Sequence, residues 1–202
     1  YTTAHTLSLH DALPICAHMD LTKKLYPALD ALIIAIENKA KTLKGTIKTG
    51  RTHLMDAMPI DFSEELKAWS SQLTSSKEML NILEKKLLEL PQGGTAVGSG
   101  INAHKQFAKC FAQEMSKLFG SKYKFVPSKN FYHELSAQDC SVQLSGELKN
   151  LALILMKISN DLRWMNSGPL AGLAEIELKA LQPGSSIMPG KVNPVIPEAV
   201  AM

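Results

Sequence analysis

The sequence predicts an all-α protein, built as a bundle of long helices. Three observations lead to this prediction. Apolar side chains recur at steps of three and four over long stretches, glycine and proline fall between the stretches, and apolar–polar alternation never lasts beyond a few positions. Such sustained spacing is typical of helices that pack at shallow crossing angles.

The first helical stripe is predicted to end just before Gly45, because glycine suits the left-handed position after a helix. Lysines crowd its last turns, where positive charge complements the helix dipole. Its apolar members are Leu25, Leu29, Leu32, Ile36 and Leu43.

The second stripe is more regular. Asp61 and Glu64 form a predicted capping box at its start, and Pro91 is predicted to close it. Its members are Leu66, Trp69, Leu73, Ser76, Leu80, Leu83 and Leu87.

A shorter helix is predicted from about residue 103 to 118, and a final long helix ends before Gly168-Pro169. Leu153, Ile154 and Trp164 place apolar surface outside the main stripe of the final helix. Burying one such side chain contributes ~1.5–3 kcal/mol, so this helix needs cover from several directions and we expect oligomerisation. The main stripe consists of Leu144, Leu148, Leu151, Leu155, Ile158, Leu162 and Met165.

The composition narrows the class of protein. A net charge of +3, with 20% charged and 45% hydrophobic residues in 202, is typical of a soluble globular domain. No basic stripe interleaved with aromatics points to nucleic acid, and no apolar run approaches the roughly 18 residues of a membrane span. Cys16, Cys110 and Cys140 are dispersed, so we predict neither disulfides nor a metal site and expect all three to be buried.

The run Gly184-Ser185-Ser186-Ile187-Met188-Pro189-Gly190-Lys191-Val192-Asn193-Pro194 is the strongest functional signal. Its glycines and prolines exclude regular structure, so its polar groups are expected on a loop. Two hydroxyls, one ammonium and one amide on a loop suit a small oxyanion such as a carboxylate.

Two further motifs stand between helical stripes. Gly50-Arg51-Thr52-His53-Leu54 places a threonine and a histidine side by side in a predicted turn. The glycine-rich run at residues 93–102 follows a helix instead of a strand and lacks GxGxxG spacing, so we interpret it as a connecting turn and not as a nucleotide site.

These motifs, together with DLRWMNSGPLAGLAEIEL at residues 161–178, resemble the class II fumarate hydratases of the fumarase/aspartase superfamily. The resemblance implies an all-helical central domain, a homotetramer with active sites shared between subunits, and no organic cofactor. It further implies a hydro-lyase that interconverts L-malate and fumarate, a small dicarboxylate substrate. The implied location is the cytoplasm, or the mitochondrial matrix in a eukaryote.

The resemblance also implies roles for individual residues. Ser185 corresponds to the base that removes a proton from carbon 3 of malate. His53 corresponds to the residue that handles the water or leaving hydroxyl, and Glu198 to the acid that orients this histidine. The implied substrate-binding residues are Thr52, Ser186, Lys191, Val192 and Asn193.

Both ends of the chain depart from the family. Residues 1–13 resemble a translated sequencing adapter, so we expect them to be non-native and residues 14–202 to form the central helical lyase domain. The N-terminal domain, with its Ser-Gly-Thr and Ser-Ser-Asn loops, and the C-terminal domain are expected to be missing. We therefore predict that the chain alone has no measurable hydratase activity.

Two alternatives remain open at this point. One is an aspartate ammonia-lyase of the same superfamily, which shares the serine loop but expels ammonia. The other is a catalytically inactive helical scaffold, since a helical bundle needs no active site to be stable.

Overall fold

The computed structural model describes residues 9–120, 122–182, 184 and 187–202. It divides into two compact units, Tyr1–Glu147 and Leu148–Met202. The described chain is mostly helical with little strand, which confirms the predicted fold class. Within that part of the chain, no helix combines the length and the apolar character needed to cross a bilayer.

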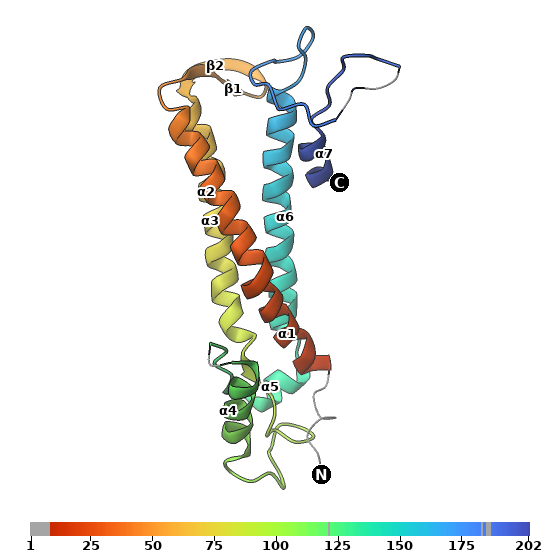
Figure 1. Ribbon diagram of the computed structural model, residues 1–202. Coiled ribbons are helices and arrows are strands. Elements are labelled where there is room, and N and C mark those ends of the chain that lie inside the picture. The colour runs from red at the N-terminus through yellow and green to blue at the C-terminus, as the bar shows by residue number, and fades with distance from the viewer. Residues whose placement is uncertain (1–8, 121, 183, 185–186) are drawn as a thin grey trace. The chain divides into compact units, whose positions relative to one another are not determined.

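The first unit contains most of the secondary structure (Figure 1). Its helices α2 and α3 run side by side, with a two-stranded hairpin at one end and the short helices α4 and α5 at the other. The elements are α1 (Leu9–Asp20), a π-helical turn (Leu21–Leu25), α2 (Tyr26–Thr42), β1 (Ile47–Thr52), β2 (Met55–Asp61), α3 (Phe62–Lys86), β3 (Glu89–Leu90), α4 (Phe107–Phe119), β4 (Val126–Pro127), α5 (Phe131–Ser136) and the start of α6 (Asp139–Met165).

Helix α3 buries the predicted stripe from Leu66 to Leu80, and Leu73 and Leu80 are fully inaccessible to solvent. Leu83 is half-buried, and Leu87 is buried just after the end of the helix. On the facing helix α2 the prediction is partly wrong. Ile33 is buried there and Leu32 is 37% exposed, because Leu29, Ile33 and Ala40, at steps of four and seven, share the helix face that meets α3.

Asp61 joins the end of β2 to the start of α3. It is the N-cap that the sequence predicts: one carboxylate oxygen accepts from the Ser63 backbone N–H at 2.8 Å. The other oxygen accepts from the Gly45 N–H at 2.9 Å, and this hydrogen bond is the main cause that lowers the pKa of Asp61. Glu64 does not complete a capping box, since it binds Lys67 instead.

The hairpin is the main departure from the predicted helical pattern. Strands β1 and β2 pair antiparallel from Ile47↔Asp61 to Thr52↔Met55, and only one residue of the pair, Gly50, is buried. A hairpin that is exposed on both faces has no buried side to impose alternation, so its sequence carries no strand signal.

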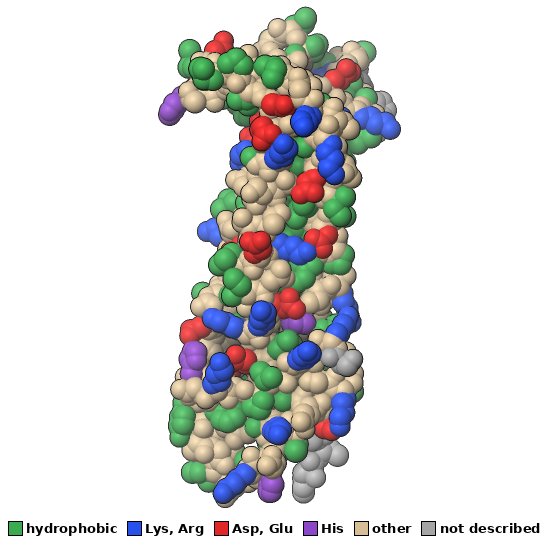
Figure 2. Space-filling view, turned by 90° about the vertical axis from the view of Figure 1, so that its left-hand side faces the viewer, with side chains coloured by type: hydrophobic (Ala, Val, Ile, Leu, Met, Phe, Trp, Pro, Cys, Tyr) green, Lys and Arg blue, Asp and Glu red, His purple; other side chains and the backbone are tan. Residues whose placement is uncertain are grey.

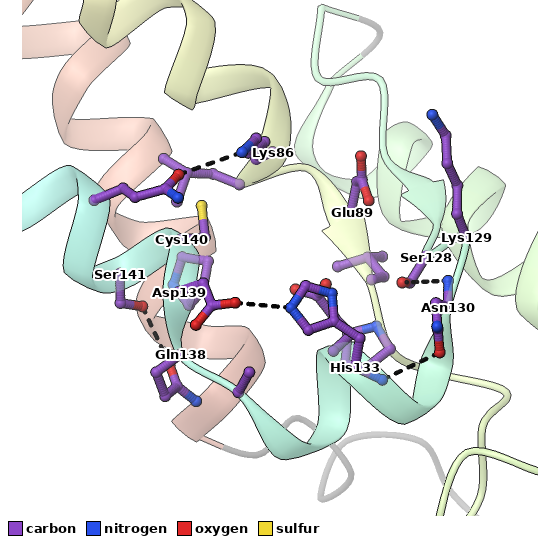
Figure 3. Close-up of a pocket in the computed structure, with 17 residues that line it drawn as sticks. Lys86, Glu89, Ser128, Lys129, Asn130, His133, Gln138, Asp139, Cys140 and Ser141 are labelled. Atoms are coloured by element: carbon purple, nitrogen blue, oxygen red, sulfur yellow. Dashed lines mark hydrogen bonds and ion pairs between the residues drawn. The ribbon is translucent and has the colours of Figure 1, made fainter.

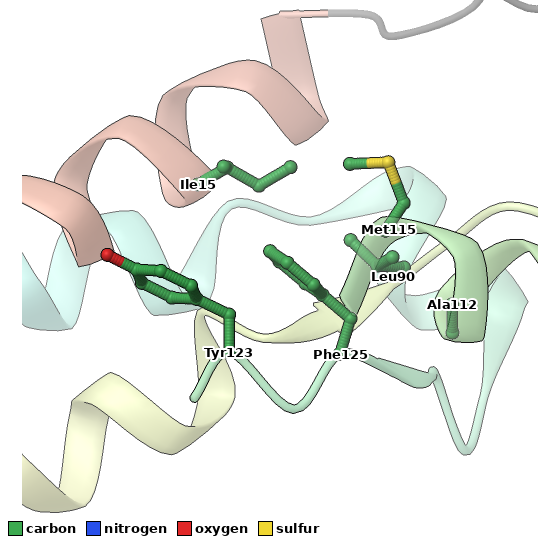
Figure 4. Packing of buried hydrophobic residues seen from close by; sticks show 6 residues of the cluster. All are labelled: Ile15, Leu90, Ala112, Met115, Tyr123 and Phe125. Carbon is green, nitrogen blue, oxygen red and sulfur yellow. The ribbon is translucent and has the colours of Figure 1, made fainter. Parts of the chain in front are cut away.

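A separate core forms around α4 (Figure 4). Helix α4 begins at Phe107 and not near residue 103, because His104 Nδ1 accepts from the Gln106 backbone N–H and holds a turn there. The two-residue strands β3 and β4 pair in parallel beside it. The buried members of this core are Ile15, Leu90, Ala112, Met115, Tyr123 and Phe125.

Much apolar surface stays exposed. On the face shown in Figure 2, hydrophobic side chains alternate with charges of both signs. Ile34 and Ile82 are each 56% exposed on α2 and α3. The expectation of buried cysteines is wrong for Cys16 and Cys110, which are exposed and free.

The second unit consists of the rest of α6, an irregular segment and the short helix α7 (Val195–Ala201). Within it, Leu151, Ile158 and Met165 of the predicted stripe are buried. Helix α6 ends at Met165, just before Gly168-Pro169, as the sequence predicts.

One buried histidine in the first unit gives the fold a pH dependence. His18 on α1 is 3% exposed, and its Nε2 lies 2.9 Å from Glu84 Oε1 on α3. Its Nδ1 is buried and has no hydrogen-bond partner among the described residues. Burial is the main cause that lowers the pKa of His18 from 6.5, and it outweighs the opposing effect of Glu84.

We expect the stability of the chain to fall as the pH drops from about 6.5 toward this lowered pKa, because the unfolded chain then binds more protons than the folded one. Urea unfolding at a series of pH values should show this slope, and the His18→Gln variant should lose it.

His133 on α5 is the control. Its hydrogen bond to Asp139 raises its pKa, so its contribution is present below 6.5 and is lost as the pH rises. A His18→Gln slope equal to that of the parent would contradict the assignment.

Candidate active site

The first group of predicted site residues lies at the tip of the β1–β2 hairpin. Thr52 ends β1, and His53 and Leu54 form the two-residue turn that leads into β2. Both turn residues have positive φ, 52° and 63°, as a type I′ turn requires. This conformation is costly for non-glycine residues and is commonly found at functional sites. The Thr52 hydroxyl and the His53 imidazole are exposed and have no partner within the described residues.

A bulge below the tip sets the direction of the turn. The register of the two strands shifts between Thr49 and Arg51, at Gly50. A Cβ on Gly50 would lie 2.5 Å from the carbonyl oxygen of Met58, so no other residue fits without moving β2. Bulges of this kind re-aim side chains, and this one lies two residues before Thr52.

The second group of predicted residues lies in the second unit, around a hollow of about 1150 Å³. Lys191, Val192 and Asn193 line one part of it, and Glu198 on α7 lines another. Four residues of the predicted set are therefore brought together. The rest of the lining comes from the end of α6 and the segment after it, including Asn160, Arg163, Trp164, Asn166, Glu175 and Glu177.

Some polar side chains of this hollow contact another polar side chain, and others have no such partner among the described residues. Glu198 Oε1 lies 3.9 Å from Arg163 Nε, and a second nitrogen of Arg163 donates to Asn160 Oδ1 at 3.0 Å. By contrast, the Lys191 ammonium and the Asn193 amide have no side-chain partner in the part of the chain that the structure describes. An unengaged cation beside an amide is suited to bind a carboxylate.

Gly184, the first residue of the signature run, lies against the backbone of Lys191 in the same run. A Cβ added to Gly184 would overlap the carbonyl oxygen of Lys191, so the two backbones are in contact only because residue 184 is glycine. Ser185 and Ser186, the predicted base and its neighbour, lie outside the described residues.

Another hollow, of about 300 Å³, lies in the first unit near the start of α6 (Figure 3). Its polar side chains mostly bind one another: His133 Nε2 and Asp139 Oδ2 are 2.8 Å apart, and Lys86 donates to Gln143. Burial raises the pKa of the Cys140 thiol in its wall, which keeps the sulfur protonated. None of the predicted site residues lines this hollow.

Sequence reasoning did not single out Arg163, although it faces Glu198. The signal that could have found it is the run at residues 161–178, which was used for the resemblance as a whole and not residue by residue. Among the described residues, no group of three or more His, Cys, Asp and Glu side chains is arranged to hold a metal ion.

Comparison with known proteins assigns the chain to a class. A family model described as lyase matches residues 8–202, and the chain therefore belongs to this lyase family. It is 52% identical over 199 residues to a protein of Pseudomonas aeruginosa named fumarate hydratase class II 2, covering 96% of this chain and 43% of that protein. A class II fumarate hydratase of Xylella fastidiosa is 54% identical over 191 residues, covering 95% of this chain and 40% of that protein.

A solved structure agrees with these matches. Recombinant class II fumarase from Schistosoma mansoni superposes with a TM-score of 0.90 at 35% identity, covering 95% of this chain and 43% of that one. The resemblance to class II fumarate hydratases stated from the sequence is thus confirmed. The chain spans about two-fifths of the length of these relatives.

Proposed function

We propose that this chain is the central part of a hydro-lyase that interconverts L-malate and fumarate. The relatives that cover almost the whole chain are named class II fumarate hydratases. The observation that carries the proposal is the hollow in which the unengaged Lys191 ammonium and Asn193 amide stand near Glu198. A dicarboxylate brings the negative charge that this cation does not meet among the described residues.

The proposed chemistry begins at Ser185. Its side chain acts as the alkoxide, which takes the carbon-3 proton of malate and becomes the neutral hydroxyl. This requires that nearby positive charge and N–H donors stabilise the alkoxide. Lys191 follows six residues later, and its backbone lies against Gly184, the residue before Ser185. Lys191 and Asn193 hold a carboxylate of the substrate, with Ser186 and Val192 beside them.

The second part of the elimination removes the hydroxyl group of malate. In the proposal, His53 gives this group its proton and Thr52 donates a hydrogen bond to the substrate. The exposure of His53 leaves its imidazole free for such a contact. Glu198 orients the histidine, since a carboxylate that accepts from one ring N–H fixes the direction of the other ring nitrogen.

We further propose that several copies of the chain build each site, in a homotetramer. The support is the apolar surface that stays exposed, including Met55 at 71% and Met58 at 76% on the hairpin that carries His53. Exposed apolar patches of this kind mark interaction surfaces, and here the occupant would be another copy of the chain.

The test uses a full-length chimera, in which residues 14–202 replace the matching part of the Pseudomonas aeruginosa relative. We expect the chimera to convert malate to fumarate, measured by the rising absorbance of fumarate, and the 202-residue chain alone to be inactive. Release of ammonia from aspartate without malate turnover would overturn the proposal in favour of an ammonia-lyase. A folded, assembled chimera that acts on neither substrate would overturn it in favour of a scaffold.

A further inference from the structure

The hairpin that carries Thr52 and His53 is attached to the start of α3 through both of its strands. Strand β2 runs directly into the helix, because Asp61 ends the strand and caps α3. Strand β1 has no such continuity with α3. Just before β1, the Thr46 carbonyl accepts from the Phe62 backbone N–H at 2.8 Å. Within β1, the side-chain link to α3 is Lys48, whose Nζ lies 2.6 Å from Glu65 Oε2 on the first turns of the helix.

This ion pair is much less exposed than the pair of Lys67 and Glu64 on the same helix. The side chains of Lys48 and Glu65 are only 11% and 23% exposed, and Lys48 Nζ also stands 4.8 Å from the centre of the Phe62 ring. Partial burial strengthens both the charge pair and the cation–π contact relative to water. By contrast, Lys67 and Glu64, also 2.6 Å apart, are 53% and 63% exposed and lie within α3 itself.

We propose that Lys48 is a positioning residue, which fixes the tilt of the hairpin and so the place of Thr52 and His53. A strand rises about 3.3 Å per residue, so the turn lies about 13–17 Å beyond Lys48. At that distance a tilt of about 5° at the base moves the tip by about 1 Å. A displacement of about 1 Å can cost roughly 100-fold in rate. The expected loss of rate rests on the proposed function.

The test compares Lys48→Met with Lys67→Met in the full-length chimera. Methionine keeps most of the stem of the lysine and removes its charge. In Lys48→Met we expect faster amide exchange in the peptide covering residues 47–61, a loss of about 10- to 100-fold in kcat/KM, and a shifted pH profile of kcat. Lys67→Met should change none of the three, because its ion pair holds no second element.

Two further variants separate positioning from general destabilisation. Lys48→Arg keeps a cation within reach of Glu65 and should retain both protection and rate. Lys48→Met combined with Glu65→Gln removes the stranded carboxylate, so it should recover the unfolding midpoint but not the rate.

The outcomes distinguish this inference from the function on which it rests. Unchanged exchange in Lys48→Met, or an equal effect in Lys67→Met, would overturn the positioning role. If the parent chimera turned over no malate, the proposed function would fail. The exchange data would in that case still decide whether Lys48 anchors β1.

Discussion

Replacing Ser185 by alanine in the full-length chimera should lower kcat for malate by about 10²–10⁴-fold, the contribution typical of a positioned proton-transfer group. The variant removes the side-chain oxygen that is proposed to take the carbon-3 proton, and it leaves Lys191 and Asn193 in place to hold the substrate carboxylate. Binding of a competitive dicarboxylate inhibitor should therefore change little, because the loss falls on the chemical step.

The neighbouring hydroxyl provides the matched control. Ser186→Ala makes the same change one residue later, and its proposed role is binding alone. We expect it to raise KM more than it lowers kcat. Steady-state kinetics with both variants decide the assignment, and equal losses of kcat at the two positions would show that Ser185 is not the base.

The second large effect concerns the core. Leu80→Ala on α3 should lower the free energy of unfolding by about 2–5 kcal/mol, because the side chain is completely buried and its removal leaves a cavity. Urea unfolding of the 202-residue chain, followed by circular dichroism, measures this loss directly.

Ile82→Ala, two residues further along the helix, is the control for this prediction. Ile82 is 56% exposed, so its truncation should cost less than about 0.5 kcal/mol. A loss at Ile82 as large as that at Leu80 would mean that another copy of the chain covers this face, and the unfolding midpoint would then depend on protein concentration.

The helices could be predicted because a helix that buries one face has apolar residues at a regular spacing in its sequence. The stripe from Leu66 to Leu80 faces a continuous partner, and the structure buries it as expected. The error at Leu32 has a local cause. Leu32 and Ile33 are both apolar, so the sequence alone does not show which of the two faces α3.

The candidate site could be predicted only where chemistry is concentrated in a short run. Lys191 and Asn193 stand in one loop with the serines, and the structure places both on a single hollow. The contact between Lys48 and Glu65 joins residues that are 17 positions apart across an unpredicted hairpin. Ion pairs of this kind depend on which strand faces which helix. The spacing of residues along a single sequence does not show which elements will face one another.

The contact between Gly184 and Lys191 has a consequence for substitutions in this loop. A side chain at residue 184 would press on the Lys191 backbone, so replacing the glycine would displace the residue whose ammonium is proposed to hold the substrate carboxylate. The mutational tolerance of this position is therefore set by a neighbour seven residues away and not by any chemistry of its own.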